Sequence, residues 1–168
     1  MFAEKIDNYN LCVSSLKSDP RSLNADTKGL GHIMFEISLA KAKDNLSQVQ
    51  ILLQGVTDPD LKRLLNECLD EYNSIVGNVM DGSKNVDLNA FNSTADKVER
   101  AYNEVQTCEE SFGEVRRRSP LTDRNKLFTS EIAVVGYIVF SYKKIILKFS
   151  SFMFQDPLQM GTCSYPSN

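Results

Sequence analysis

Residues 61–112 read LKRLLNECLDEYNSIVGNVMDGSKNVDLNAFNSTADKVERAYNEVQTCEESF, and this stretch decides the fold. Its apolar residues recur at alternating intervals of three and four, the period of an amphipathic helix. The first half carries one apolar stripe, made of Leu61, Leu65, Cys68, Tyr72, Ile75 and Val79. The second half carries another, made of Phe91, Ala95, Val98, Tyr102, Val105, Cys108 and Phe112. We therefore expect two long helices that pack through these stripes.

Cys68 and Cys108 lie on the two stripes and predict where the chain reverses. Facing residues of an antiparallel hairpin are equally far from its turn, so a Cys68–Cys108 disulfide places the turn midway, at residues 87–90. Asp81-Gly82-Ser83 is the stronger local turn signal, but a helix that ended there would put the two cysteines beyond disulfide reach. We therefore expect the first helix to continue through Gly82, at a cost of about 1 kcal/mol. Two buried free thiols are the alternative.

Further helices are expected on both sides of this hairpin. Helical spacing predicts a long helix over residues 24–54, which Asp26 can cap, and Thr57-Asp58-Pro59 marks the start of the next helix. Another long helix is expected after Ser119-Pro120, with an apolar face of Leu127, Phe128, Ile132, Val135 and Val139. We expect residues 1–19 to form a short helix or a helical hairpin. The fold class is therefore all-α, an up-down-up-down four-helix bundle with a short N-terminal helical extension.

The composition argues against several classes of function. The net charge of −3 gives no basic surplus for nucleic-acid binding, and the run at residues 116–118 fits a solvated loop between helices better than a phosphate site. The hydrophobic stretch at residues 132–154 is interrupted by three lysines, which argues against a membrane span. His32 is the single histidine and no C-x-x-C pair is present. We expect no enzyme activity, no cofactor and no metal site.

Five motifs resemble, in order and spacing, the plant invertase/pectin methylesterase inhibitor family, over about residues 7–130. They are Tyr9–Leu16, Asp26–Gly31, Leu64–Tyr72, Thr107–Phe112 and Ser119–Thr122. The nearest resemblance is to a group of invertase inhibitors that includes a pollen allergen. The family implies a four-helix bundle with an N-terminal helical hairpin and one disulfide in each, no cofactor, and an acid invertase or pectin methylesterase as partner.

The resemblance also sets expectations for compartment and boundaries. It implies a protein that is secreted to the cell wall or held in the vacuole and that is a monomer when no enzyme is bound. The chain begins without a charged segment followed by an apolar one, so we expect either an intracellular protein or a mature or truncated form. Residues 1–142 are expected to form the inhibitor domain, with an incomplete hairpin at residues 1–20. Residues 143–168 form a tail with no family counterpart, and we expect residues 145–168 to pack poorly.

One family cysteine is missing. It should lie near Phe2 or Ala3, so Cys12 is expected to have lost its usual partner, and a Cys12–Cys163 bridge would contradict this.

The turn between the two central helices is the candidate partner-binding site. In some invertase inhibitors a Pro-Lys-Phe tripeptide at this turn enters the enzyme's active site, and the corresponding residues here are Asn89, Ala90 and Phe91. Proline at 89 and lysine at 90 are expected to strengthen binding, through a preorganised loop and charge complementarity. The alternative is that Phe91 only begins the apolar stripe. Two sequons make Asn45 and Asn92 possible glycosylation sites.

The leading functional hypothesis is inhibition of plant acid invertase by docking and loop insertion. Inhibition of pectin methylesterase through a helical face is the alternative. A third hypothesis, from a different class, is a helical homologue that inhibits neither enzyme.

Overall fold

The computed structural model describes the backbone of residues 2–150 and the side chains of residues 10–141. This part of the chain consists of helices joined by short loops. They are α1 (Phe2–Lys17), the 3-10 helix η1 (Pro20–Asn24), α2 (Thr27–Gly55), α3 (Pro59–Asp87), α4 (Phe91–Glu114) and α5 (Thr122–Ser150).

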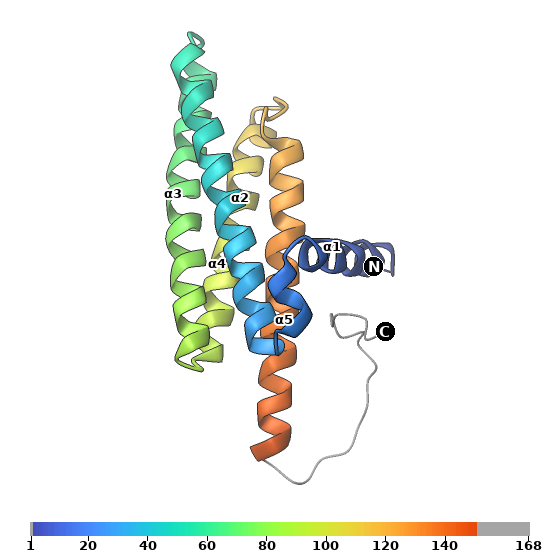
Figure 1. Cartoon of the computed structure of the whole chain (residues 1–168). Coiled ribbons are helices and arrows are strands. Elements are labelled where there is room, and N and C mark those ends of the chain that lie inside the picture. The colour runs from blue at the N-terminus through green and yellow to red at the C-terminus, as the bar shows by residue number, and fades with distance from the viewer. Residues whose placement is uncertain (1, 151–168) are drawn as a thin grey trace.

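The four long helices α2 to α5 form an up-down-up-down bundle, and α1 projects from its side next to α5 (Figure 1). Each long helix packs on its neighbour in sequence, and α5 returns to pack on α2 and close the ring. The core between them is apolar, with Tyr72, Phe35, Phe112 and Phe128 among its largest fully buried side chains. This arrangement confirms the expected fold class.

The register predicted from the cysteines is confirmed. Cys68 and Cys108 form a disulfide between α3 and α4, with their Cα atoms 4.7 Å apart. Helix α3 continues to Asp87 and α4 begins at Phe91, so the chain reverses where the cysteine pair places the turn. The local turn signal around Gly82 is overridden.

Gly82 has a packing role that helix propensity does not show. A Cβ at this position would lie 2.9 Å from Cε1 and 3.1 Å from Cζ of Phe35 on α2. Phe35 is itself only 1% exposed, so it has little room to move. The glycine therefore allows α2 and α3 to approach closely.

We expect Gly82→Ala to destabilise the fold by about 1 to 3 kcal/mol through overpacking, although alanine is the better helix former. Gly77→Ala is the matched control, because it lies on the same helix with nothing within 4 Å of its added Cβ. The free energy of unfolding of that control should rise by up to about 1 kcal/mol, because alanine is the better helix former. Urea unfolding of both variants measures the difference, and equal effects at the two positions would contradict the packing role.

Two long helices begin where the sequence predicts. The Asp26 carboxylate accepts a hydrogen bond from the backbone N–H of Gly29 at 2.8 Å and so caps α2. The Asp58 carboxylate caps α3 in the same way and also pairs with Arg117 of the α4–α5 loop at 2.6 Å. The hydrogen bond from Arg117 holds the pKa of Asp58 below its ordinary value. This pair joins the start of α3 to the loop before α5.

Some residues placed on apolar faces from the sequence are exposed. Ala95 of α4 is exposed, and Tyr102 is 39% exposed, because both lie at the edge of α4 beside α5 rather than between α3 and α4. Leu127 of α5 is 41% exposed. Helical spacing predicts which residues share a face, whereas the width of the buried part depends on how closely the neighbouring helix packs.

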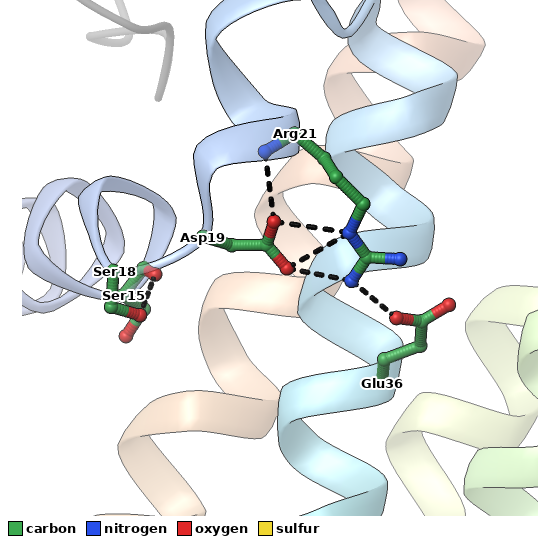
Figure 2. A network of polar contacts seen from close by, with 5 residues as sticks. All are labelled: Ser15, Ser18, Asp19, Arg21 and Glu36. Carbon is green, nitrogen blue, oxygen red and sulfur yellow. Dashed lines mark hydrogen bonds and ion pairs between the residues drawn. The ribbon is translucent and has the colours of Figure 1, made fainter.

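The segment between α1 and α2 is fixed by a small ionic network (Figure 2). Arg21 pairs with Asp19 at 2.6 Å and with Glu36 of α2 at 2.6 Å. Hydrogen bonds from Arg21 lower the pKa of Asp19, and those from Arg21 to both carboxylates raise the pKa of the guanidinium. The network attaches the turn before η1 to the bundle.

Cys12 is 1% exposed and disulfide-bonded, although the family's first cysteine is missing. The expectation about a Cys12–Cys163 bridge involves Cys163, which lies outside the described residues. Helix α5 continues to Ser150 without a break at residues 142 and 143. The expectation for residues 151–168 falls outside the described residues, and the domain boundary at 142 stays a prediction.

Candidate functional site

The turn between α3 and α4 closes one end of the bundle (Figure 1). Leu88 follows the last residue of α3, and its side chain is 75% exposed. Asn89 adopts a left-handed conformation with φ 54°, which asparagine tolerates better than most residues. The backbone N–H groups of Asn89 and Ala90 donate to the carbonyls of Val86 and Asn85, at 3.1 and 2.9 Å. The turn therefore presents an apolar side chain from a hydrogen-bonded backbone.

Helix α2 holds this turn from the side. Lys28 donates from Nζ to the backbone carbonyl of Asp87 at 3.2 Å. His32 Nε2 lies 3.0 Å from Oδ1 of Asp87, and His32 Nδ1 lies 3.5 Å from the hydroxyl oxygen of Ser83. His32 thus joins α2 to the end of α3, which is a structural place for the single histidine.

Phe91 differs from Leu88 in its surroundings. It is half-buried and lines an apolar groove of about 240 Å³ between α4 and α5, together with Val98, Ile132 and Phe140. This placement fits the alternative in which Phe91 begins the stripe of α4. The sequence indicates Phe91 as the aromatic residue of the turn, whereas Leu88 is the apolar side chain that the turn exposes. The sequence signal for this exposed side chain is a leucine that lies between two polar residues, Asp87 and Asn89, at the predicted turn.

The turn conformation bears on the expectation of a proline at position 89. Proline fixes φ near −65° and has no N–H, whereas Asn89 has φ 54° and donates its N–H to Val86. The expected gain from Asn89→Pro is therefore contradicted for this backbone. Ala90→Lys is compatible, because Ala90 has φ −86° and its side chain makes no capping hydrogen bond.

The two sequons differ in accessibility. Asn45 is fully buried; its Nδ2 donates to the hydroxyl of Tyr72 at 3.0 Å, and its Oδ1 accepts from Arg124 at 3.1 Å. A glycan on Nδ2 would require this side chain to leave the core, so the structure contradicts Asn45 as an acceptor in the folded chain. Asn92 lies exposed in the first turn of α4, and its glycosylation stays a prediction.

A polar cluster inside the core was not foreseen from the sequence. The Tyr72 hydroxyl donates to Oδ1 of Asn125 at 2.6 Å, and Nδ2 of Asn125 donates to Glu109 at 2.8 Å. With the hydrogen bond from Asn45, the cluster joins α2, α3, α4 and α5. Burial raises the pKa of Tyr72 well above its ordinary value, so the phenol stays neutral. Single asparagines on predicted helices give no signal that they meet in three dimensions.

The arginine run, possible metal sites and possible membrane spans remain to be placed in the structure. Arg116, Arg117 and Arg118 lie exposed in the loop between α4 and α5, as expected for a solvated loop. Within residues 10–141, no group of three or more histidine, cysteine, aspartate or glutamate side chains is placed to hold a metal ion. None of the described helices combines the length and the apolar character that crossing a bilayer requires.

An antiparallel four-helix bundle with a helix projecting from its side and an exposed turn at one end defines a class of small helical proteins. Residues 3–135 match the family described as "Plant invertase/pectin methylesterase inhibitor". The chain belongs to this family.

Relatives carry the names of both kinds of inhibitor. "Putative invertase inhibitor" from Platanus orientalis is 30% identical over 128 residues, which cover 76% of this chain and 75% of that protein. "Pectinesterase inhibitor" from Actinidia deliciosa is 32% identical over 108 residues, which cover 64% of this chain and 58% of that protein. The crystal structure of a pectin methylesterase inhibitor from Arabidopsis thaliana matches with a TM-score of 0.64 at 20% identity, over 69% of this chain and 78% of that one. The likeness to the solved structure shows the fold.

Proposed function

We infer that this protein inhibits a plant acid invertase by docking onto the enzyme with the α3–α4 turn. The proposal rests on membership of the family and on the similarity to a relative named as an invertase inhibitor. The matched region covers about three-quarters of both chains. The inhibitor would act through its surface, without catalysis. A protein of the cell wall or the vacuole fits this proposal, because other relatives are named cell wall / vacuolar inhibitors of fructosidase.

The single observation that carries the proposal is the exposed turn itself. Leu88 is 75% exposed, the largest exposed fraction among the large apolar side chains within residues 10–141. The backbone that presents it is held by hydrogen bonds from Asn89 and Ala90 and by Lys28 and His32 of α2. A preorganised turn loses less conformational entropy when it enters a cleft than a flexible loop does.

Leu88→Ala should weaken inhibition of an acid invertase about 30-fold. Truncating an apolar anchor that is buried on binding typically costs about 2 kcal/mol. Folding should be unaffected, because the side chain is 75% exposed in the free protein. The measurement is the inhibition constant at mildly acidic pH, with the melting temperature recorded for each variant.

Ile51→Ala is the matched control for this experiment. Ile51 is a 57% exposed apolar residue of α2, at the end of the bundle opposite the α3–α4 turn. It should leave the inhibition constant within about twofold, since isolated exposed contacts contribute little. Equal losses for the two variants would show that Leu88 is not an anchor. Ala90→Lys adds a second arm, with tighter inhibition expected if the turn meets acidic residues of the enzyme.

A second candidate function is inhibition of pectin methylesterase through the face formed by α3 and α4. The observation that favours it is a polar cluster on that face, where Ser74 and Asn78 donate to Glu104 at 2.5 and 2.8 Å. Burial, and then the nearby Glu104 and Asp70, raise the pKa of Glu71 beside this cluster. Loss of inhibition on Glu104→Gln but not on Leu88→Ala would favour this candidate.

A further inference from the structure

Glu131 of α5 is a buried carboxyl group that the proposed function does not use. Its residue is only 5% exposed, and Oε2 has no hydrogen-bond partner. Burial raises the pKa of Glu131, and the positive charge of Lys41 on α2 opposes this effect. A buried carboxylate without a donor is costly, whereas the neutral acid is tolerated better.

The contacts between α2 and α5 place a second unpaired oxygen at the level of Glu131. Arg124 pairs with Asp44 at 2.6 Å, and a Cβ on Gly31 would lie 3.7 Å from Ile138. In antiparallel helices these two contacts put Glu131 opposite Ser38. Ser38 is fully buried, and its hydroxyl oxygen also lacks a hydrogen-bond partner. Among residues 10–141, none donates a hydrogen bond to Oε2 of Glu131.

Helix α1 packs on α5, the helix that carries Glu131. Glu131, Val134 and Ile138 share one face of α5 and are all buried, whereas Leu127, one turn earlier on the same face, is 41% exposed. Helix α1 packs on both α5 and α2; it meets α5 partway along its length and projects outward from there (Figure 1). Leu16, near the end of α1, is only 1% exposed. The end of α1 that Leu16 occupies is therefore packed on the bundle.

Few charges surround Glu131. On α2, Lys41 is the charged group that acts on it, while Glu36 pairs with Arg21. On the part of α1 whose side chains are described, the one charged residue, Lys17, is exposed at the helix end. On α4, Glu104 accepts hydrogen bonds from α3. Within these described residues, Lys41 alone offsets a negative charge on Glu131.

We propose that Glu131 makes the packing of α1 on the bundle pH-dependent, with the neutral acid allowing close packing and the carboxylate loosening it. A carboxyl whose pKa is raised by folding contributes stability below its unfolded value, near 4.5, and loses that contribution as the pH rises through its folded value. Helix α1 should therefore be held tightly in acid and loosely near neutrality. This device is independent of which enzyme the protein inhibits.

Hydrogen exchange of the full chain tests the proposal. Amide protection is measured at about pH 5 and about pH 8, corrected for intrinsic exchange, and α1 is compared with α3. In the wild type, protection of α1 should fall about tenfold for each pH unit by which folding raises the pKa of Glu131. Protection of α3 should stay nearly constant. Glu131→Gln, which keeps the shape and removes the charge, should retain α1 protection at the higher pH.

Two further variants make the test decisive. Asp123→Asn removes an 87% exposed carboxyl at the start of α5 and should behave as the wild type. Lys41→Met removes the offsetting charge and should reduce α1 protection further at the higher pH. Equal pH profiles for the wild type and Glu131→Gln would overturn the proposal. So would a parallel loss of protection in α1 and α3, because that would mean global unfolding.

Discussion

Replacing both Cys68 and Cys108 by alanine should lower the free energy of unfolding by about 4 kcal/mol. The disulfide closes a loop with a sequence separation of 40 residues, and the chain-entropy model gives about this value for such a loop. Both residues are fully buried, so loss of their packing adds to the effect. For a chain of 168 residues, the melting temperature should fall by about 10 °C.

The double variant is preferable to chemical reduction, because a reductant would also open the disulfide of Cys12. Circular dichroism should show that the variant remains helical at low temperature, since the disulfide constrains mainly the unfolded chain. A loss of less than about 1 kcal/mol would mean that packing alone fixes the α3–α4 register.

Tyr72→Phe should also have a large effect, lowering the free energy of unfolding by about 2 to 4 kcal/mol. The Tyr72 hydroxyl donates to Asn125 and accepts from Asn45, at 2.6 and 3.0 Å, in a fully buried position. Its removal leaves one amide oxygen and one amide nitrogen without this partner, and each costs about 1 to 3 kcal/mol. Chemical unfolding of the purified variant measures the loss.

Tyr102→Phe is the matched control, because it makes the same change on α4 at a residue that is 39% exposed. Its effect should stay within about 0.5 kcal/mol. If the two variants lose similar stability, the buried cluster contributes little, and the Tyr72 ring alone accounts for its place in the core.

The sequence predicted the architecture because the deciding signals are periodic and long. Stripes over residues 61–112 fix two helices, and the pair Cys68–Cys108 fixes their register more strongly than the local signal at Gly82. Asp26 and Asp58 mark helix starts because capping acts over only a few residues. These features depend on spacing along the chain and therefore need no knowledge of tertiary contacts.

The features that escaped prediction depend on contacts between distant segments. The cluster around Tyr72 takes one residue from each of several helices, and the clash that would follow Gly82→Ala involves Phe35 of α2. The bonded state of Cys12 could not be foreseen from a missing family cysteine. At the turn, the sequence could not show that Leu88 is exposed while Phe91 is half-buried.

The most direct test of the central claim is the inhibition constant of the wild type and Leu88→Ala, measured against an acid invertase and a pectin methylesterase at mildly acidic pH. We predict that the wild type inhibits the invertase and that Leu88→Ala, with unchanged melting temperature, is about 30-fold weaker. Inhibition of the pectin methylesterase alone, or of neither enzyme, would contradict the account.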